Sequence, residues 1–245
     1  MSMATRKVRQ LLLPFWIAIA FFLIALLAVQ TVAFAAALPT STLSVPAMQI
    51  GETFDFTVTF DSSGSTGYGP FIDLIFPATG ADGDDGITFN SATYLGISVP
   101  AVQLTFPMTG CVDHPYAEDT MHTPLRVCGT PGDTLVVLQL PFGSFTPGQP
   151  PVEVTVNATM SNLADLNVAQ TIRSRAGFQY GNDALDNPCC DPSITNPSSI
   201  DGTTWPGTSV SPFLYSLSKV YSGPEDETAT GPNFPRRYRI EIDVA

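Results

Sequence analysis

The stretch "TFDFTVTF", residues 53–60, decides the fold. Its apolar positions are Phe54, Phe56, Val58 and Phe60, and the polar positions between them are Asp55, Thr57 and Thr59. A period of two residues is that of a β-strand with one buried face and one face in water. The stretch therefore predicts a strand that lines one side of a hydrophobic core.

Further stretches of strand length follow along the chain. They are separated by turns rich in Gly and Pro, of which the 245 residues include 19 and 22. The clearest are "FIDLIF" (71–76), "ITFNSATYLG" (87–96), "DTLVVLQLPF" (133–142), "VEVTVNATM" (152–160) and "AQTIRSRAGFQY" (169–180). Strands at such short spacing predict an all-β protein, with an Ig-like or fimbrial-type antiparallel β-sandwich. In the last stretch we expect Arg173 and Arg175 on the face in water.

Residues 1–37 have the features of an export signal. Three basic residues precede an apolar run at residues 11–29, and "AFA" (33–35) follows with small residues at A-x-A spacing. We expect a signal helix that is cleaved. The run is also close to the ~20 residues that span a bilayer, so an uncleaved anchor is the alternative. Either way, the rest of the chain is expected to be extracellular or at the cell surface.

The charge balance excludes some classes of partner. The chain carries 10 basic and 22 acidic residues, a formal net charge of −12 at pH 7. Lys219 is the one lysine outside the first ten residues. Because nucleic acid and anionic lipid both require positive charge on the protein, this acidic chain is expected to bind neither.

The four cysteines are expected to be oxidised, because disulfides persist in exported proteins. Cys111 and Cys128 bracket an irregular insertion, and a disulfide closing such a loop is worth ~3 kcal/mol in the chain-entropy model. Cys189 and Cys190 are adjacent. They could pair with each other, pair with the first two or remain free, so the connectivity stays open.

Neither zinc binding nor catalysis is indicated. Cys111, His114, His122 and Cys128 are side-chain types that bind zinc, but their spacing is not that of a zinc finger, and a disulfide is the better interpretation. The chain has two histidines, no G-x-S-x-G motif and no recognisable pair of catalytic carboxylates. We therefore expect a protein that is not an enzyme.

The acidic turn "ATGADGDDG" (78–86) offers a candidate calcium site. Asp82, Asp84 and Asp85 supply hard oxygen ligands, and the glycines between them allow carbonyl groups to point inward. The spacing departs from the EF-hand loop, so the other interpretation is a solvated Gly/Asp turn without metal. No other cofactor is expected.

The exported part divides by composition. Residues 38–180 form the strand-rich module, and residues 181–212 have the Gly, Pro, Asn and Ser content of a loop or linker. Residues 213–245 return to strand patterning and resemble the start of a second module. About 33 residues cannot bury a core of their own. We therefore expect this last segment to be poorly ordered or docked on the first module.

Three phrases carry a resemblance to a known family. They are "GETFDFTVTFDSSGSTGYGPFIDLIFPATGADGDDGITF" (51–89), "GTPGDTLVVLQLPFGSFTPGQPP" (129–151) and "SLSKVYSGPEDETATGPNFPRRYRIEIDVA" (216–245). They resemble the conserved-repeat modules, of unknown function, in large bacterial surface proteins, which are grouped with isopeptide-forming fimbrial adhesin domains. The resemblance implies β-sandwiches strung in tandem that build stalks and adhesins. The chain then looks like a fragment, whose partners are other modules of a longer protein and a host or cell-surface ligand that the sequence does not name.

The resemblance also implies a role for Lys219. In isopeptide-forming relatives, a lysine on the first strand bonds to an Asn or Asp on a late strand. Lys219 matches the lysine position of the second, incomplete module, and its partner would lie beyond residue 245. The first module has no lysine between residues 38 and 218, so it cannot form such a bond internally.

Two further functions stay open beside a non-catalytic surface module. One is a secreted carbohydrate-binding or carbohydrate-active module, in which exposed aromatic rings would form a platform for sugars. The candidates for that platform are Tyr68, Tyr94, Tyr116 and Trp205. The other is a calcium-binding structural module, built on the acidic turn.

Overall fold

A computed structural model describes residues 36–79, 84–118, 123–166, 168–182, 193–194, 201–221 and 238–244. The chain divides into two units, residues 1–35 and 36–245. The expected signal helix lies outside the described residues. Among the residues that are described, no helix is long and apolar enough to cross a membrane.

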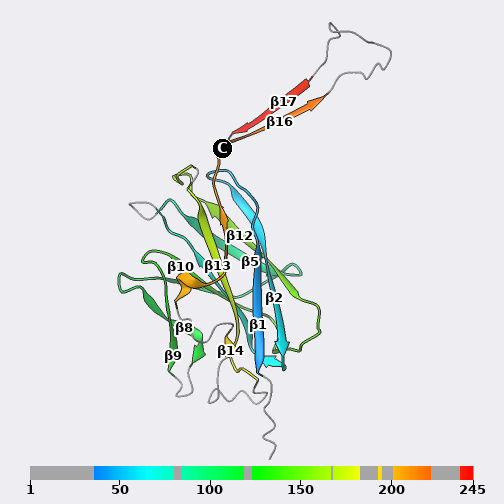
Figure 1. The fold of residues 1–245 in the computed structure, drawn as a ribbon, viewed down its shortest axis with the longest axis vertical. Helices are drawn as coiled ribbons and strands as arrows, with labels where there is room; N and C mark the ends of the chain where they lie inside the picture. Colours follow the sequence, from blue (N-terminus) through cyan, green and yellow to red (C-terminus); the bar gives the residue numbers. More distant parts are fainter. Residues whose placement is uncertain are drawn as a thin grey trace, which may run out of the picture. The chain divides into compact units, whose positions relative to one another are not determined.

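The first sheet of the sandwich has five antiparallel strands (Figure 1). In spatial order they are β1 (Ala37–Ser44), β2 (Thr53–Gly64), β12 (Val152–Met160), β5 (Ile87–Tyr94) and β6 (Ile97–Ser98). The stretch "TFDFTVTF" is thus the first two thirds of β2, which lies between β1 and β12.

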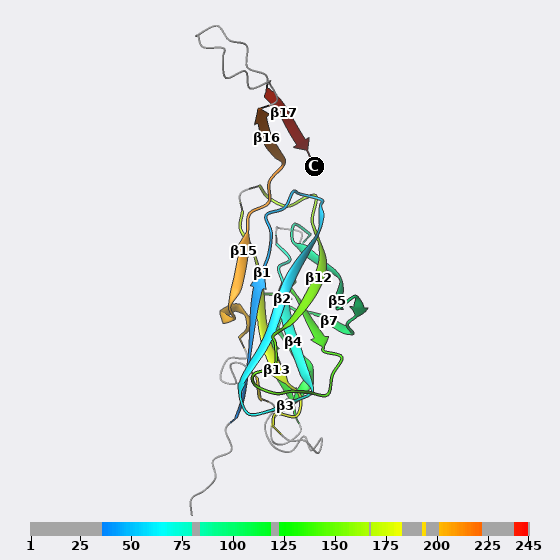
Figure 2. The same ribbon diagram turned by 90° about the vertical axis from the view of Figure 1, so that its right-hand side faces the viewer.

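The second sheet packs against the first (Figure 2). Its strands, in spatial order, are β14 (Ser193–Ile194), β13 (Gln170–Phe178), β4 (Pro70–Phe76), β10 (Thr134–Gln139) and β7 (Ala101–Thr105), and β15 (Gly207–Val210) also pairs with β13. All of these pairings are antiparallel. The prediction of an all-β antiparallel sandwich is confirmed.

The main core lies between the two sheets and follows the alternation of the sequence. On β2, the side chains of Phe54, Phe56, Val58 and Phe60 are buried. The ring of Phe60 lies edge-on to Phe145 and Phe178, with ring centroids 5.3 and 5.6 Å apart. Such aromatic pairs contribute beyond the apolar area that they remove from water.

A second core covers the outer face of the second sheet. It is formed with a hairpin of β8 (Cys111–Glu118) and β9 (Pro124–Cys128) and with the short 3-10 helix η2 (Gly202–Thr204). Its buried members are Phe71, Ile75, Phe106, Ala117, Val127, Leu135, Val137 and Trp205. Because β4 and β10 have a core on each face, they are the nearly continuous apolar runs of the sequence.

Two sequence predictions about irregular segments need correction. The segment between the first two cysteines was expected to be irregular, yet β8 and β9 pair across it, with Cys111 opposite Cys128. Within 181–212, expected to be loop or linker, β14 and β15 pair with β13. A segment rich in Gly, Pro and Ser has no alternating apolar pattern from which a strand could be predicted. Such a composition does not exclude strands whose stability comes from backbone hydrogen bonds to a neighbour.

The position of η2 depends on Gly202. A Cβ at this residue would overlap the Ile75 side chain and lie 2.9 Å from the carbonyl oxygen of Cys128. Asp201 forms a β-bridge with Cys128, and its carboxylate accepts a hydrogen bond from the Thr203 amide at 3.0 Å. The segment that follows the undescribed residues 195–200 is therefore tied to the hairpin of β8 and β9.

Two small sheets complete the described structure. Strands β3 (Gly67–Tyr68) and β11 (Ser144–Phe145) form one, and β16 (Tyr215–Tyr221) and β17 (Tyr238–Val244) form the other. Every residue of β16 and β17 is exposed. Residues 213–245, expected to be poorly ordered or docked on the first module, are described at 213–221 and 238–244. These parts contact the sandwich through the bridge between Phe213 and Gln49 and through the hydrogen bond from Gln49 Nε2 to the Asp243 carbonyl at 3.3 Å. They include a regular hairpin whose two strands have no burying neighbour among the described residues.

Candidate functional site

The candidate site is a group of four side chains buried in the second core: Asp73, His114, Arg175 and Trp205. Asp73 comes from β4, His114 from β8, Arg175 from β13, and Trp205 follows η2. We call this group the buried clamp. Each of its members exposes 3% of its surface or less.

The carboxylate of Asp73 is the centre of the clamp. Its Oδ1 lies 2.8 Å from His114 Nε2, and its Oδ2 accepts hydrogen bonds from Arg175 Nε at 2.9 Å and Nη2 at 2.6 Å. The Nδ1 atom of His114 accepts from the backbone amides of Tyr116 at 3.1 Å and Ala117 at 2.7 Å. Since Nδ1 is an acceptor, the ring proton lies on Nε2 and is donated to Asp73.

Aromatic rings enclose these polar groups. The guanidinium carbon of Arg175 lies 4.1 Å from the ring centroid of Trp205, a cation–π contact. On another side, the rings of His114 and Phe71 have centroids 4.8 Å apart. The Trp205 Nε1 atom has no hydrogen-bond partner among the described residues, so packing and Arg175 hold the indole in place.

The electrostatics of the clamp keep Asp73 ionised. Burial by itself would raise the pKa of this carboxyl group, but the neighbouring His114 and Arg175 outweigh that effect and hold its pKa below the usual value. A buried carboxylate that accepts three hydrogen bonds, with one arginine to balance its charge, meets the usual requirement for a charge in a protein interior.

The arrangement is suited to holding layers together. Both oxygens of Asp73 are engaged, and the acceptor nitrogen of His114 is used by the backbone of its own strand. No atom of the pair is left in contact with solvent, because the side chains of Asp73 and His114 are both 0% exposed. The clamp therefore joins β8 to β4 and β13, and we assign it a structural role.

Two sequence predictions are wrong at this site. Arg175 does not lie on the face in water, because the hairpin of β8 and β9 and the segment at η2 cover that face of β13. Trp205 is buried beneath the same cover and cannot form a platform for sugars. Of the other platform candidates, Tyr68, Tyr94 and Tyr116 are half-buried.

Sequence reasoning missed the clamp, although a signal for it existed. Asp73 interrupts the otherwise apolar "FIDLIF", and all seven residues of β4 are buried. A carboxylate inside a fully buried strand needs a cationic or hydrogen-bonding partner. Arg175 and Asp73 stand opposite each other in the pairing of β13 with β4, but only the strand register shows this.

The hairpin of β8 and β9 contains the two cysteines on which both the disulfide and the zinc hypotheses depend. In the structure Cys111 and Cys128 form a disulfide, with 2.06 Å between the sulfur atoms. Their thiolates are then not available to a metal, and His114 is committed to Asp73. Cys189, Cys190 and His122 lie outside the described residues, so nothing is added about them.

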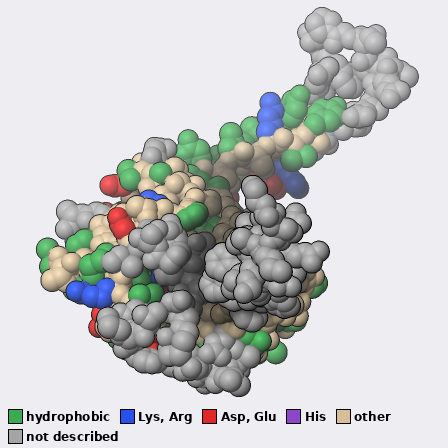
Figure 3. All heavy atoms as spheres, turned by 60° about the horizontal axis from the view of Figure 1, so that its bottom comes forward, with side chains coloured by type: hydrophobic (Ala, Val, Ile, Leu, Met, Phe, Trp, Pro, Cys, Tyr) green, Lys and Arg blue, Asp and Glu red, His purple; other side chains and the backbone are tan. Residues whose placement is uncertain are grey.

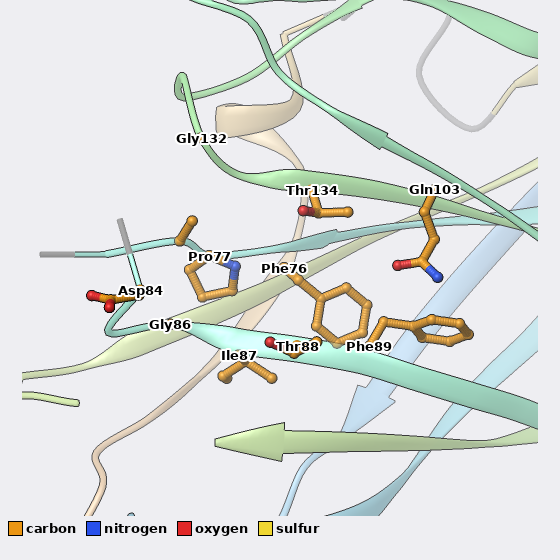
Figure 4. A pocket seen from close by; sticks show the side chains of 11 residues that line it. Phe76, Pro77, Asp84, Gly86, Ile87, Thr88, Phe89, Gln103, Gly132 and Thr134 are labelled. Atoms are coloured by element: carbon orange, nitrogen blue, oxygen red, sulfur yellow. The ribbon is translucent and has the colours of Figure 1, made fainter. Parts of the chain in front are cut away.

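A cleft of about 180 Å³ opens near the acidic turn (Figure 4). Figure 4 shows Asp84 at one end and Gln103 at the other, with the rings of Phe76 and Phe89 along its wall. The backbone of Asp85 is already tied down: its amide donates to the Thr79 carbonyl at 3.0 Å, and its carbonyl accepts from Gln170 Nε2 at 2.9 Å.

Of the three aspartates in the calcium hypothesis, the structure describes Asp84 and Asp85. Asp82 lies outside the described residues. Within the described ranges, no three His, Cys, Asp or Glu side chains come together in a way that could hold a metal ion. Nearby, burial raises the pKa of Asp133, whose Oδ1 accepts a hydrogen bond from the Ala78 amide at 2.9 Å. The calcium site and the metal-free turn thus both stay open as hypotheses.

Lys219 lies in the middle of β16, opposite Ile240 of β17. Its Nζ atom is 4.1 Å from the ring centroid of Tyr238. The residue is exposed, and the isopeptide role that the family resemblance implies stays a prediction.

No family model and no curated protein sequence matches the chain. Among solved structures, the 35 kDa C-terminal fragment of the major pilin GBS80 of Streptococcus agalactiae is 14% identical, with a TM-score of 0.34, over 78% of this chain and 60% of that fragment. The seventh ScaB type I cohesin from Pseudobacteroides cellulosolvens is 9% identical, with a TM-score of 0.36, over 79% of this chain and 99% of the cohesin.

A third solved structure belongs to an enzyme. AvmM, which catalyses macrocyclization in alchivemycin A biosynthesis, is 14% identical, with a TM-score of 0.38, over 79% of this chain and 92% of its own. At such identities and TM-scores, none of these likenesses carries an argument about function.

Proposed function

We propose that this chain is an exported, non-catalytic β-sandwich module of a cell-surface protein, which acts as a spacer or presentation unit. The features of residues 1–37 support export, and the resemblance of three sequence phrases to surface modules supports the class. In the described structure, the one dense group of charged side chains is closed to solvent and joins layers.

The observation that carries the proposal is where the chain enters and leaves the sandwich. At one end, the Ala36 carbonyl accepts from the Ser65 amide at 3.3 Å, and Ala37 pairs with Gly64. At the other end of β1, Phe213 forms a bridge with Gln49, in the turn between β1 and β2. The eight residues of β1 run between these two points and span about 25 Å at ~3.3 Å per residue. Modules that are entered at one end and left at the other can be joined in line.

Two internal links stiffen the module between these ends. The buried clamp joins β8 to the second sheet, and the disulfide closes the hairpin of β8 and β9. Both links act on the hairpin of β8 and β9, which among the described residues is not a strand of either main sheet. A spacer benefits from such links because a rigid unit transmits force and position better than a flexible one.

The test of the proposal is the location and oxidation state of the full chain. We would express it in a bacterium with a C-terminal epitope tag and add protease to intact cells. Loss of the tag, with Cys111 and Cys128 oxidised on a non-reducing gel, is the expected result. A matched chain in which Arg6, Lys7 and Arg9 are replaced by Glu should keep the tag protected. A protected tag and reduced thiols in the unaltered chain would show that the module is not exported.

A mechanical measurement tests the spacer role separately. The full chain, held at its two ends in a single-molecule force experiment, should unfold its sandwich in one step, at a higher force than the Asp73→Asn variant. Unfolding at a force equal to that of the variant, or in many small steps, would argue against a mechanical role.

A further inference from the structure

We propose that the hairpin of β16 and β17 is a self-association surface, through which two copies of this chain pack face to face. This inference goes beyond the spacer role, because it names the partner of one particular surface. It rests on the pattern, exposure and charge of the hairpin itself.

The hairpin has one apolar and one polar face. Directly opposite residues share a face, and on one face the pairs are Tyr215 with Val244, Leu217 with Ile242, Lys219 with Ile240, and Tyr221 with Tyr238. The other face carries Ser216, Ser218, Val220, Arg239, Glu241 and Asp243. Seven of the eight side chains on the first face are therefore aliphatic or aromatic. We call it the apolar face of the hairpin.

This apolar face is in contact with water. Leu217 and Ile242, which form one of the two central rows of the face, each expose 64% of their surface. Figure 3 shows hydrophobic side chains at the surface along the hairpin, between tan and blue groups. A two-stranded hairpin alone is at best marginally stable in water, and three or more strands or a covering layer are normally required. We therefore infer that another surface covers the apolar face of the hairpin.

The size of the face fits a second copy. Its seven apolar side chains expose between 37% and 64% of their surface. With ~150–250 Å² for an aromatic side chain and somewhat less for an aliphatic one, they offer on the order of 700 Å² per copy, close to the ~800 Å² per partner of a standard interface. Two identical apolar faces supply this area without any other protein.

The charge distribution also favours this region for contact between copies. The chain as a whole has a net charge of −12, so two copies repel each other over most of their surface. The described hairpin is balanced: Lys219 and Arg239 offset Glu241 and Asp243, and Arg239 Nε lies 3.0 Å from Glu241 Oε1. A neutral, apolar region on an acidic chain is where like-charge repulsion between copies is weakest.

The position of Lys219 is compatible with two-fold packing. A two-fold axis across the strands at the centre of the face would place the Lys219–Ile240 row of one copy on the Leu217–Ile242 row of the other. The two lysines then do not meet. Each ammonium group is already directed at the ring of Tyr238, toward the end of the hairpin, with 4.1 Å from Nζ to the ring centroid.

The test is the oligomeric state of the chain, purified in the form in which an expressing cell exports it. We expect a reversible monomer–dimer equilibrium in sedimentation velocity runs at several protein concentrations. The Ile242→Lys variant should raise the dissociation constant of the dimer by roughly 30-fold or more, the effect of losing one central contact of ~2 kcal/mol. Added salt should tighten the wild-type dimer, because it screens the repulsion between acidic copies.

Val220→Lys is the matched control, because Val220 is an exposed valine on the polar face of the same hairpin, opposite Arg239. Its dimer should form about as well as that of the wild type. A wild-type chain that stays monomeric at every concentration overturns the proposal, and the apolar face then belongs to another partner or to further polypeptide. Equal weakening by Val220→Lys and Ile242→Lys also overturns it, because the apolar face would then not be the contact.

Discussion

Strands β2 and β17 have the same sequence pattern and opposite surroundings. Residues 53–60 of β2 and all of β17 place an apolar side chain at every second position, with polar or charged residues between. On β2 those apolar side chains are buried, and Phe60 is in contact with two other rings. On β17 the corresponding side chains of Ile240 and Ile242 are 60% and 64% exposed.

This difference shows that an alternating sequence gives a strand an apolar face, but that other segments of the chain must bury this face. The buried face of β2 is covered by strands such as β4 and β13, which lie far away in the sequence. The face of β17 has only its own hairpin partner among the described residues. Whether an apolar face is buried is thus decided by the whole fold, whereas the face itself is defined by a few consecutive residues.

The largest expected effect comes from truncating one apolar residue on each strand. Phe60→Ala should lower the free energy of unfolding by about 4 kcal/mol, because it removes a fully buried ring and leaves a cavity. Ile242→Ala should leave the unfolding of the sandwich unchanged. Denaturant titrations followed by tryptophan fluorescence would measure both, since Trp205 lies in the second core. Equal losses from the two variants would mean that the hairpin is part of the sandwich core.

The buried clamp offers the next largest effect. Asp73→Asn leaves Arg175 buried without its counter-charge, and should lower the free energy of unfolding by about 3 kcal/mol. Asp113→Asn is the matched control. Its carboxylate lies 3.7 Å from Arg126 on the surface, with side chains 70% and 62% exposed, and such exposed pairs contribute little. The structural role assigned to the clamp fails if the two variants unfold at the same denaturant concentration.

The disulfide allows a comparison between the two hairpins that lie outside the main sandwich sheets. The double variant Cys111→Ala, Cys128→Ala should lower the free energy of unfolding by about 2–3 kcal/mol. The two cysteines are 17 residues apart in the sequence, and without the disulfide the unfolded chain between them gains conformational entropy. The hairpin of β16 and β17 has no such staple among its described residues. Limited proteolysis should therefore cut it before the hairpin of β8 and β9 in the wild type. Prior cleavage within β8 or β9 would contradict this order.

Acid should remove the contribution of the clamp over a defined range of pH. The pKa of Asp73 is lowered in the folded state, so its stabilisation is present at neutral pH and is lost as the pH falls below the unfolded value of 3.8 and through the folded pKa. The difference in unfolding free energy between wild type and Asp73→Asn should then shrink below about pH 4. A difference that stays constant to low pH would show that Asp73 stabilises the fold by shape and not by charge.

The smallest expected effect concerns calcium. The backbone of Asp85 is already held by Thr79 and Gln170, so we expect Asp84 and Asp85 to keep their conformation without metal. EDTA should leave the melting temperature unchanged, and calorimetry should detect no calcium binding. A higher melting temperature in calcium, abolished by Asp84→Asn, would instead establish the calcium site that the sequence suggested.

The fold was largely predictable, but the site was not. "TFDFTVTF" predicted one strand with a buried face, and the repeated Gly and Pro turns predicted a sandwich, which is confirmed. The clamp required knowing that β13 pairs with β4 so that Arg175 faces Asp73. It also required knowing that Trp205, from a segment with loop composition, covers that face.

The sequence by itself determined the strands with an alternating pattern, such as β2, β12 and β17, and the two faces of each one, because a period of two depends only on neighbouring residues. The tertiary structure decided which of those faces are covered. It buries Arg175, which was expected in water, and Trp205, a candidate for the sugar platform, and leaves Ile240 and Ile242 exposed. The physical reason is that burial needs a second surface, and that surface comes from segments whose position no local pattern encodes.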